Sequence, residues 1–354
     1  MKALKKFLGI KHPIIQSPMA GVQRSALAIA VSNAGGLGSL PCAMLSPAEL
    51  HSELTSLRAG TDKPVNLNFF CHTPPEPDAQ REAAWRDLLA PYYDEFAIPQ
   101  PQYPPSGSTR APFSREAADL LQEFRPAVVS FHFGLPSTDL VARVKAMGSL
   151  VLSTATTVEE AIWLEKHGAD AIIAQGLEAG GHRGIFLSND LLDLTSQMGT
   201  FALLPQIVRA VRVPVIAAGG IANARGVAAA LALGASAVQI GTAFLLCSEV
   251  FTTPIHRSAL KSEAARHTAI TNLFTGRPAR GIVNRIMKER GPISAAVPAF
   301  PLAGAALGPL RTKAESLGDG GFSPLWCGQN ASGCAELPAA EVVRKLAAGA
   351  SAPR

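Results

Sequence analysis

The chain has 354 residues, of which 47% are hydrophobic, 6% aromatic and 17% charged. This length suits one large α/β domain with an appendage or two ordinary domains, and the aliphatic composition suits a core of packed parallel strands. The net charge of +5 is mild, and no block of Lys and Arg with interleaved aromatic residues indicates a nucleic-acid partner. Because no apolar run reaches about 18 residues, the sequence predicts no membrane span.

The cysteines are five in number, and none shows the spacing of a metal-binding pair. An odd count without CxxC motifs indicates neither a disulfide framework nor a metal site, and it favours a reducing compartment. Met1–Lys6 is basic but leads into no apolar segment, so the sequence shows no signal peptide. We therefore expect a cytoplasmic protein without a metal, while a monomer and a homodimer both remain open.

Short apolar runs recur along the first two-thirds of the chain, and most are followed by a helical stretch. Such alternation predicts an α/β fold, a closed (β/α)8 TIM-type barrel, with an open doubly wound sheet as the alternative. Thr157 and Glu160 have capping-box spacing in a helix that ends at Gly168, and Asn223 can cap the helix ending at Gly234. The predicted strands are Pro13–Gln16, Gly36–Leu40, Val65–Asn68, Ala127–Phe131, Ser149–Ser153, Ala169–Ala174, Pro214–Ala218 and Ala237–Ile240.

The uneven spacing of these runs predicts the domain organisation. Residues 1–247 form the barrel, interrupted by a Pro-rich excursion at 73–109 that we expect to be irregular. A smaller, mainly helical cap at 248–321 lies on the barrel mouth. Residues 322–354 return to the barrel and end in a low-complexity tail, Ala347–Arg354, that we expect to be frayed.

Polar and glycine residues follow the predicted strands, at the end where a (β/α)8 barrel carries its active site. The most unusual segment is Gln175–Gly184, which has four glycines in ten residues. Glycines destabilise a helix or strand interior, so here they indicate close approach of the backbone to a ligand. His182 is then presented to that ligand; a mobile turn with a solvent-facing histidine is the alternative.

Two glycine-containing turns after neighbouring strands predict a phosphate site. Gly219 and Gly220 follow one strand, and Gly241 and Thr242 follow the next. Backbone N–H groups of such turns converge on a phosphate, and the Thr242 hydroxyl adds a donor. The alternative is that the glycines only let helices pack closely on strands. A Rossmann site at Gly35–Gly38 is disfavoured because this segment precedes a strand instead of joining a strand to a helix.

At these motifs the sequence resembles the nitronate monooxygenases, formerly called 2-nitropropane dioxygenases, and among them the class I branch. The resemblance covers nearly the whole chain, and the loop bearing His182 is its most specific part. It implies an FMN enzyme that oxidises alkyl nitronates with O₂ to a carbonyl compound and nitrite or related nitrogen oxides. The implied substrate is propionate 3-nitronate, a toxic anion, so the implied role is detoxification; nitroalkanes are further candidates. The matching segments are Pro13–Gly21, Asn66–Phe70, Glu178–Gly184, Gln239–Phe244, Thr268–Gly281 and Leu325–Gln329.

The resemblance also implies roles for single residues. His182 would be the catalytic histidine. A substrate carboxylate would need a cation, for which Arg183 and basic residues of the cap are candidates. His132 and Gln329 are candidates for the substrate pocket, although His132 can equally be a structural histidine. FMN would be held by Pro18, Met19, Ala20, Asn68, Gln175, Gly180, Gly181, Gly219, Gly220, Gln239, Ile240, Gly241 and Thr242.

Other functions remain open at this point. An NAD(P)H-dependent FMN reductase of the quinone or enoyl-acyl-carrier-protein type would share the phosphate-binding glycines, as would a non-enzymatic flavin- or phosphate-binding module. An IMP-dehydrogenase-like barrel is disfavoured, because no cysteine lies in the loops after the fifth to seventh strands. His72 and His256 lie in contexts that indicate surface or helix-end positions, and they receive no role.

Overall fold

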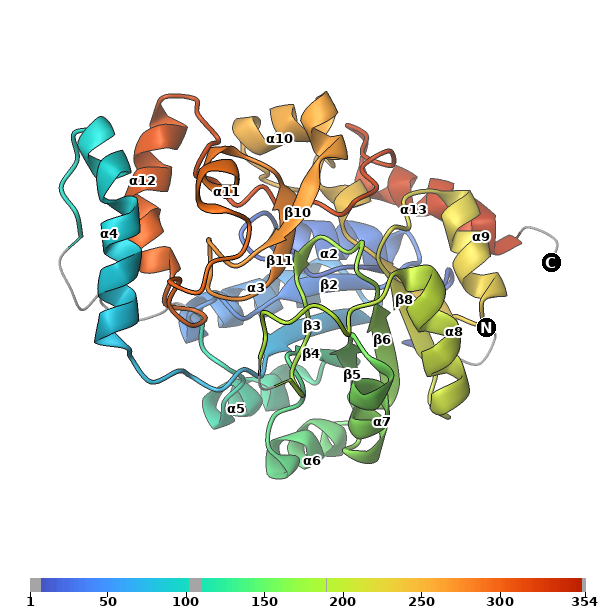
Figure 1. Cartoon of the computed structure of the whole chain (residues 1–354). Helices are drawn as coiled ribbons and strands as arrows, with labels where there is room; N and C mark the ends of the chain where they lie inside the picture. The colour runs from blue at the N-terminus through green and yellow to red at the C-terminus, as the bar shows by residue number, and fades with distance from the viewer. Residues whose placement is uncertain (1–7, 102–109, 189, 352–354) are drawn as a thin grey trace.

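The computed structural model describes residues 8–101, 110–188 and 190–351. Within them, parallel strands form a ring in the order β1-β9-β8-β6-β5-β4-β3-β2, and a parallel bridge between Ile15 and Leu37 closes it (Figure 1). The predicted (β/α)8 TIM-type barrel is confirmed. Its strands are β1 Ile14–Gln16, β2 Gly38–Pro41, β3 Val65–Phe70, β4 Val128–His132, β5 Leu150–Ala155, β6 Ala171–Gln175, β8 Val215–Ala218 and β9 Ala237–Ile240.

Successive residues of each strand face opposite sides of the barrel wall. Ile15, Ile173 and Ile216 fill the interior, whereas their neighbours Ile14 and Ile172 pack outward against the helices. This alternation is why the strands consist of continuous apolar runs: both faces are buried. The surrounding helices are α2 Ser25–Asn33, α3 Pro47–Gly60, α5 Arg115–Phe124, α6 Thr138–Ala146, α7 Val158–Lys166, α8 Thr200–Ala210, α9 Ala224–Ala232 and α13 Ala339–Ala347.

Two of the predicted helix starts are present. Thr157 caps α7 by accepting from the N–H of Glu160, and Asn223 caps α9 by accepting from the N–H of Gly226. The capping box at α7 is incomplete, because the Glu160 carboxylate accepts from the N–H and hydroxyl of Thr156 instead of the Thr157 N–H.

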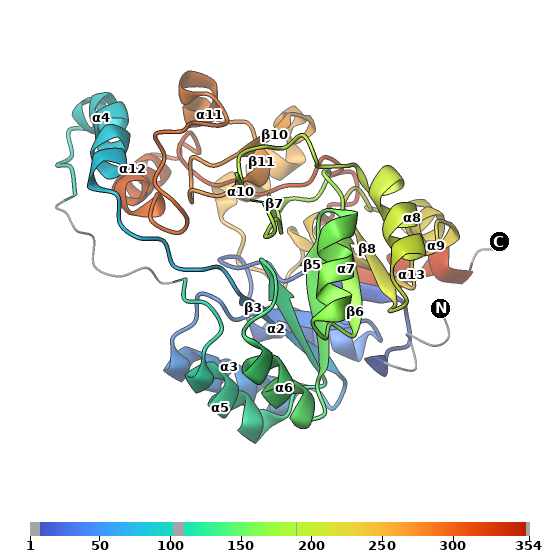
Figure 2. The ribbon, with the colours of Figure 1, turned by 60° about the horizontal axis from the view of Figure 1, so that its bottom comes forward.

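The cap lies over one end of the barrel (Figure 2). Its helices are α10 Pro254–Lys261, α11 Arg285–Arg290 and α12 Gly304–Ser316, and its strands are β10 Thr268–Thr271 and β11 Ala279–Ile282. These two strands and β7, Gly181–His182, form an antiparallel sheet in the order β10-β11-β7. This sheet was missed by the sequence analysis, which expected a mainly helical cap. Short 3-10 turns occur at Thr242–Phe244, Glu263–Arg266 and Ala348–Ser351.

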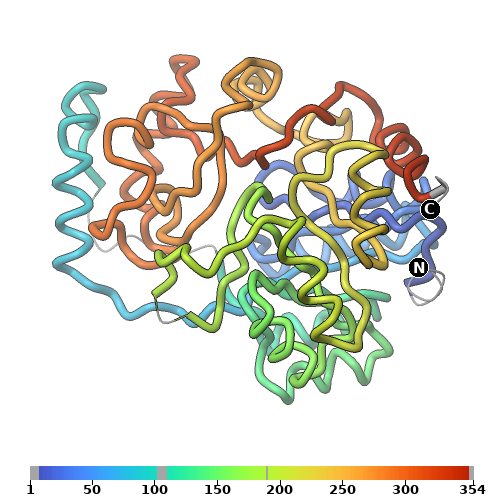
Figure 3. Tube along the Cα trace, turned by 45° about the vertical axis from the view of Figure 1, so that its right-hand side comes forward, coloured from blue at the N-terminus to red at the C-terminus, as the bar shows by residue number. Residues whose placement is uncertain are grey.

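The Pro-rich excursion is not irregular throughout, because Ala79–Glu95 forms the helix α4. Its N-cap, Asp78, accepts from the N–H of Arg81, and one face buries Trp85 and Leu89. These side chains join a cap cluster that includes Leu310 of α12. Figure 3 shows α4 alongside the cap segments and apart from the barrel helices. The excursion therefore belongs structurally with the cap; its residues 102–109 lie outside the described part.

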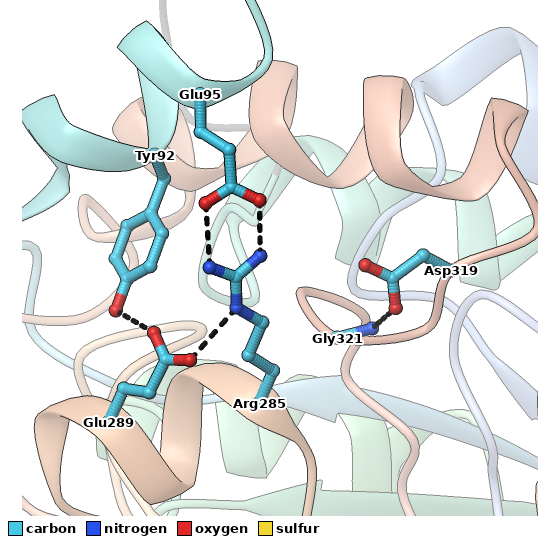
Figure 4. Close-up of polar contacts among 6 residues, drawn as sticks. All are labelled: Tyr92, Glu95, Arg285, Glu289, Asp319 and Gly321. Atoms are coloured by element: carbon cyan, nitrogen blue, oxygen red, sulfur yellow. Dashed lines mark hydrogen bonds and ion pairs between the residues drawn. The ribbon is translucent and has the colours of Figure 1, made fainter.

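Charged contacts reinforce the packing of α4 on the cap (Figure 4). The Arg285 guanidinium of α11 binds both carboxylate oxygens of Glu95, at 2.7 and 2.6 Å, and donates from Nε to Glu289 at 2.9 Å. The hydroxyl of Tyr92 donates to the same Glu289 at 2.8 Å. Helices α4 and α11 are thus joined by a bidentate pair, the strongest geometry available to arginine and a carboxylate.

The tail is ordered further than expected. Helix α13 runs to Ala347, which is buried, and a 3-10 turn follows to Ser351. Gly349 lies so close to the carbonyl of Ala224 that a Cβ at this position would overlap it. Residues 352–354 lie outside the described part. Met1–Lys6, where the sequence analysis expected no signal peptide, lies outside it as well. Among the described helices, none has the length and apolarity needed to traverse a bilayer.

Candidate active site

A cavity of about 280 Å³ opens at the carboxyl ends of the barrel strands, under the cap. Every residue that the sequence suggested for the flavin lines it, from Pro18 after β1 to Thr242 after β9. His132 and His182 line it as well. The carboxyl ends of parallel strands meet at one rim, so residues distant in sequence converge there.

One wall of the cavity is bare backbone. Gly219 and Gly220 follow β8 with φ of +114° and +70°, conformations that favour glycine. A Cβ on Gly241 would lie 3.3 Å from the Cβ of Ser17. These glycines line the cavity together with Thr242, and backbone N–H groups beside a hydroxyl are the chemistry of a phosphate site.

The returning segment after the cap closes this wall. The N–H of Gly328 donates to Oγ1 of Thr242 at 2.9 Å, and a Cβ on Gly180 would lie 2.5 Å from the Gly328 nitrogen. The N–H of Gln329 donates to the carbonyl of Glu178 at 2.9 Å. The Gln329 residue is exposed and does not line the cavity, so its predicted place in the substrate pocket is wrong. Its neighbours Gly328 and Asn330 line the cavity instead.

One buried acceptor in the cavity lining lacks a partner. Oε1 of Gln239 is inaccessible to solvent and accepts no hydrogen bond from the described residues. Burying an amide oxygen without a partner costs free energy, so native proteins rarely leave one unpaired. Gln239 thus fits a ligand that carries an N–H donor.

His182 lies on strand β7, which pairs with β11 of the cap through Ala279. Its Nε2 is 2.9 Å from the hydroxyl oxygen of Thr275. Two side chains donate to its backbone carbonyl: Nε2 of Gln175 at 2.9 Å and Nε2 of His132 at 3.2 Å. His182 therefore lies in a hydrogen-bonded strand between the barrel and the cap. The structure does not show the alternative, a turn with a solvent-facing histidine.

The hydrogen bonds assign the ring protons. When the Thr275 hydroxyl donates to the carbonyl of Arg277, 3.4 Å away, its oxygen accepts from Nε2–H of His182, and the lone pair of the neutral ring is then on Nδ1. His132 donates from Nε2 to a carbonyl and accepts at Nδ1 from the hydroxyl of Thr154, 3.1 Å away. Both imidazoles are neutral in this arrangement.

Burial and nearby charges favour the neutral form. Burial is the main cause that holds the pKa of His182 well below its ordinary value, and Arg110, His132, Arg277 and His72 add to the effect. Burial, with Arg277, lowers the pKa of His132 to about 3. An imidazole that is neutral at neutral pH can accept a proton, which a cation cannot.

Arg183, the predicted partner of a substrate carboxylate, points away from the cavity. It is fully buried and donates to the carbonyls of Gln175 and Gly176, at 2.7 Å each, and to Oε1 of Gln197. The prediction is wrong because the Arg183 side chain is directed at these carbonyls and at Gln197, whereas His182 lines the cavity. Arg183 instead anchors the backbone of the loop on which His182 lies.

Aromatic rings surround the His182 imidazole. Phe70, Phe133, Phe300 and Trp326 have ring centroids 5.4 to 6.2 Å from that of His182. Phe133 has a φ of +71°, a strained conformation for a residue other than glycine, and such strain often accompanies a functional site. Sequence reasoning missed this wall, since its rings come from four separate segments.

Other residues of the site were also missed. Thr275 lies in the matching segment Thr268–Gly281, but the sequence gave this residue no role. His256 lies in the first turn of α10, a helix-end position as expected, but it is 5% exposed, lines the cavity and bonds through Nε2 to the carbonyl of Trp326 at 3.1 Å. His72 is likewise buried, at 6% exposed. Arg311, one of the basic cap residues that the sequence analysis considered, lines the cavity, and so does Arg110, which had no signal in the sequence.

Fold and site together define a (β/α)8-barrel enzyme with a glycine-lined ligand cavity and a neutral histidine at its rim. The family model of nitronate monooxygenase matches residues 1–349. The nitronate monooxygenase of Paraburkholderia phytofirmans is 44% identical over 98% of this chain and 94% of its own length. That of Pseudomonas aeruginosa is 45% identical over 96% and 97%. The chain belongs to the nitronate monooxygenase family and is a flavin-dependent oxidative enzyme.

Solved structures of similar proteins agree with this family assignment. The nitroalkane oxidase of Streptomyces ansochromogenes matches with a TM-score of 0.88 and 39% identity, covering 98% of this chain and 97% of its own. FabK from Thermotoga maritima matches less closely, with a TM-score of 0.71 and 29% identity, covering 97% of this chain and 94% of its own.

Proposed function

We propose that the protein uses FMN and O₂ to oxidise alkyl nitronates, propionate 3-nitronate foremost, to a carbonyl compound and nitrite or related nitrogen oxides. The observation that carries the proposal is the place of His182, whose imidazole lines the same cavity as Gly219, Gly220 and Gly241 and whose pKa is lowered by burial. The relatives named nitronate monooxygenase and the nitroalkane oxidase support the reaction class.

The lining residues fit FMN. Gly219, Gly220, Gly241 and Thr242 would hold the phosphate, because their backbone N–H groups and one hydroxyl suit an oxyanion. The unpartnered Oε1 of Gln239 would accept from the imide N–H of the flavin ring. The remaining ring contacts would come from Asn68, Gln175, Gly180, Gly181, Ile240 and the Pro18–Ala20 turn, all of which line the cavity.

The bound flavin would supply the electron transfer from the nitronate to O₂. The chain's own residues position the substrate and handle its proton. With Nε2–H bound to Thr275, His182 has its lone pair on Nδ1, so it can take the proton from the α-carbon of a neutral nitroalkane. Gln175 and His132 both donate to the backbone carbonyl of His182, and these hydrogen bonds fix the position of its ring in the cavity. The aromatic wall excludes water from the imidazole.

We propose a cytoplasmic location and a role in detoxification. All five cysteines are free thiols, and none of them is exposed. A chain that leaves five thiols unpaired suits a reducing compartment. Removing a toxic nitronate anion from that compartment would be the benefit of the reaction.

The proposal is tested with purified protein. We expect an absorbance spectrum of oxidised flavin, release of FMN on denaturation, and O₂ consumption with propionate 3-nitronate. The His182→Asn variant should keep FMN but lose about 10²–10⁴-fold in kcat/KM for nitroethane, the usual contribution of a positioned acid or base. Wild-type turnover in this variant would remove His182 from the reaction.

The fold shared with FabK makes an NAD(P)H-dependent reductase the function to exclude. Anaerobic addition of NADH should leave the flavin oxidised, whereas anaerobic addition of the nitronate should bleach it. Rapid bleaching by NADH would favour the reductase and contradict the proposal.

A further inference from the structure

A short part of the segment that returns from the cap, residues 327–334, lies across the two loops that follow β8 and β9. We call it the strap. The N–H of Cys327 donates to the carbonyl of Arg280 in β11, at 3.3 Å, which ties the start of the strap to the cap. Near its other end, a Cβ on Gly333 would overlap the carbonyl oxygen of Ala222, so the strap backbone lies directly on the loop after β8.

The strap donates hydrogen bonds to oxygen atoms of both loops. Nδ2 of Asn330 donates to the carbonyl of Gly220 at 2.9 Å. Sγ of Cys334 donates to the carbonyl of Thr242 at 3.0 Å, and the N–H of Gly328 donates to Oγ1 of the same threonine at 2.9 Å. In all three contacts the strap supplies the donor and the loop supplies the acceptor.

The direction of the Asn330 amide is fixed by its neighbour in the strap. Oδ1 of Asn330 accepts from the N–H of Ser332 at 3.2 Å and from the Ser332 hydroxyl at 2.7 Å. Because a backbone N–H can only donate, the amide atom that faces Ser332 is the oxygen, and the NH2 group faces Gly220. The hydrogen bond to the Gly220 carbonyl therefore follows from the fold of the strap itself.

Acceptors and donors of the two loops are satisfied unequally. The carbonyl of Gly219 also has a donor, the hydroxyl of Thr200 at 3.0 Å. Four backbone N–H groups of the loops, by contrast, donate to no other residue in the part of the chain that the structure describes. They belong to residues that line the cavity, namely Gly219, Gly220, Ile221 and Gly241.

This asymmetry leaves donors available for an anion. In a trans peptide the C=O and the N–H point in opposite directions, so a carbonyl held by the strap turns the next N–H away from the strap. For the carbonyl of Gly220, that next group is the N–H of Ile221. The Thr242 hydroxyl accepts from Gly328 and so keeps its own hydrogen for a second partner. Donors without acceptors are what a phosphate requires, because its oxygens accept hydrogen bonds.

We propose that Gly328, Asn330 and Cys334 of the strap are positioning residues for the phosphate of the flavin. They occupy the oxygen atoms of the two loops and so keep the N–H and O–H donors turned toward the ligand. The strap thereby makes the site select FMN over a flavin that lacks the phosphate. This inference rests on the proposed function for the identity of the cofactor.

The test measures which flavin the purified holoenzyme retains. The enzyme is equilibrated with an equimolar excess of FMN and of riboflavin, which has the same ring and ribityl chain but no phosphate. The bound flavins are then separated and quantified after gel filtration. In Asn330→Leu the ratio of bound FMN to bound riboflavin should fall by about 2- to 10-fold, the usual effect of losing one hydrogen bond.

The matched control is Asn33→Leu, at the end of α2 and therefore at the opposite rim of the barrel. The Asn33 amide has the same kind of contacts as that of Asn330. Its Nδ2 donates to the carbonyl of Gly60 at 3.1 Å, and its Oδ1 accepts from the hydroxyl of Thr61 at 2.6 Å. Asn33→Leu should keep the wild-type ratio of the two flavins.

A strap that only stabilised the fold would give a different result in Asn330→Leu. Both flavins would then bind more weakly, and their ratio would stay at the wild-type value. That outcome, or a wild type without preference for FMN, overturns the inference. Should Asn330→Leu not fold, Ser332→Ala at an exposed position removes one of the two donors that fix the Asn330 amide. Its ratio should fall by about 2-fold, and an unchanged ratio contradicts the role of the strap.

Failure of the proposed function is recognised separately. If the wild type prefers FMN but oxidises no nitronate, the proposed reaction is wrong and the role of the strap stands. If the wild type binds neither flavin, FMN is wrong as the cofactor, and inorganic phosphate tests the strap instead. Phosphate should then raise the melting temperature of the wild type and of Asn33→Leu more than that of Asn330→Leu. Equal shifts in the three proteins would overturn the inference.

Discussion

The barrel and the cap are stabilised in different ways, and the site lies where they meet. The barrel consists of parallel strands with aliphatic residues on both faces. The cap, together with α4, is packed around aromatic residues such as Trp85 and Phe322 and is joined by charged contacts such as Arg285 with Glu95. His182 belongs to both, because its chain leaves β6 of the barrel and pairs with β11 of the cap.

The barrel and the cap contribute different groups to the site. The barrel supplies the glycines after β8 and β9, whereas the cap supplies Thr275 and Arg277, which act on His182, and Arg311, which lines the cavity. Changes at the junction should therefore have larger effects than changes within the cap.

The largest effect is expected at Arg183, which anchors the loop of His182 to the barrel. Arg183→Met removes the Arg183 donors of the Gln175 carbonyl and of Oε1 of Gln197, whereas the Gly176 carbonyl keeps the N–H of Ala179. Each unsatisfied acceptor costs about 1–3 kcal/mol, so we expect a loss of about 3 kcal/mol or more in the free energy of unfolding, with loss of bound flavin. Urea denaturation and the flavin content of the purified variant measure both. A midpoint equal to that of Arg209→Met, a control at an exposed position of α8, would contradict this role.

The barrel was predictable from the sequence because its pattern is local. Each strand is a short apolar run between turn residues, and the residues that follow it lie at one rim by the geometry of the fold. The glycine wall and His182 were found in this way. The errors at Arg183 and Gln329 arose because the direction of each side chain depends on the distant segment that its backbone contacts, Pro278 for Arg183 and Glu178 for Gln329, which neighbouring residues do not reveal.

The cap was less predictable, since its partners are far apart in the sequence. Trp85 of α4 donates to the carbonyl of Ala303, and no periodic pattern links such residues. For the same reason Thr275 and Arg110 went unnoticed: each reaches His182 only through the tertiary fold.

A second prediction concerns Arg277, a cap residue that acts on His182 through its charge. Arg277 is 6% exposed, donates to the carbonyl of Ile185 and lies 3.9 Å from the ring centroid of Phe133. Burial is the main cause that lowers the pKa of His182; Arg110, His132 and His72 contribute, and so does Arg277. Removing this cation raises that pKa, so the neutral base is lost at a higher pH. In Arg277→Gln the acidic limb of kcat/KM for nitroethane should move to higher pH.

The matched control for this prediction is Arg277→Lys, which keeps the positive charge and should keep the limb near its wild-type position. If Arg277 were only structural, kcat/KM would fall in both Arg277→Gln and Arg277→Lys, and the acidic limb of the pH profile would stay in place. The same outcome would show that Arg277 has no electrostatic effect on the imidazole.

The smallest effect is expected at the contact between α4 and α11, which lies within the cap and away from His182. The side chains of Arg285 and Glu95 are 33% and 46% exposed, and exposed ion pairs contribute only about 0.2–1 kcal/mol. Glu95→Gln should therefore lower the melting temperature by only about 1–3 °C, and less in 1 M salt, where such charges are screened. Amide hydrogen exchange should accelerate in α4 but not in the barrel strands. If the strands also exchanged faster, the excursion would be part of the barrel's cooperative unit, and the distinction between the two regions would fail.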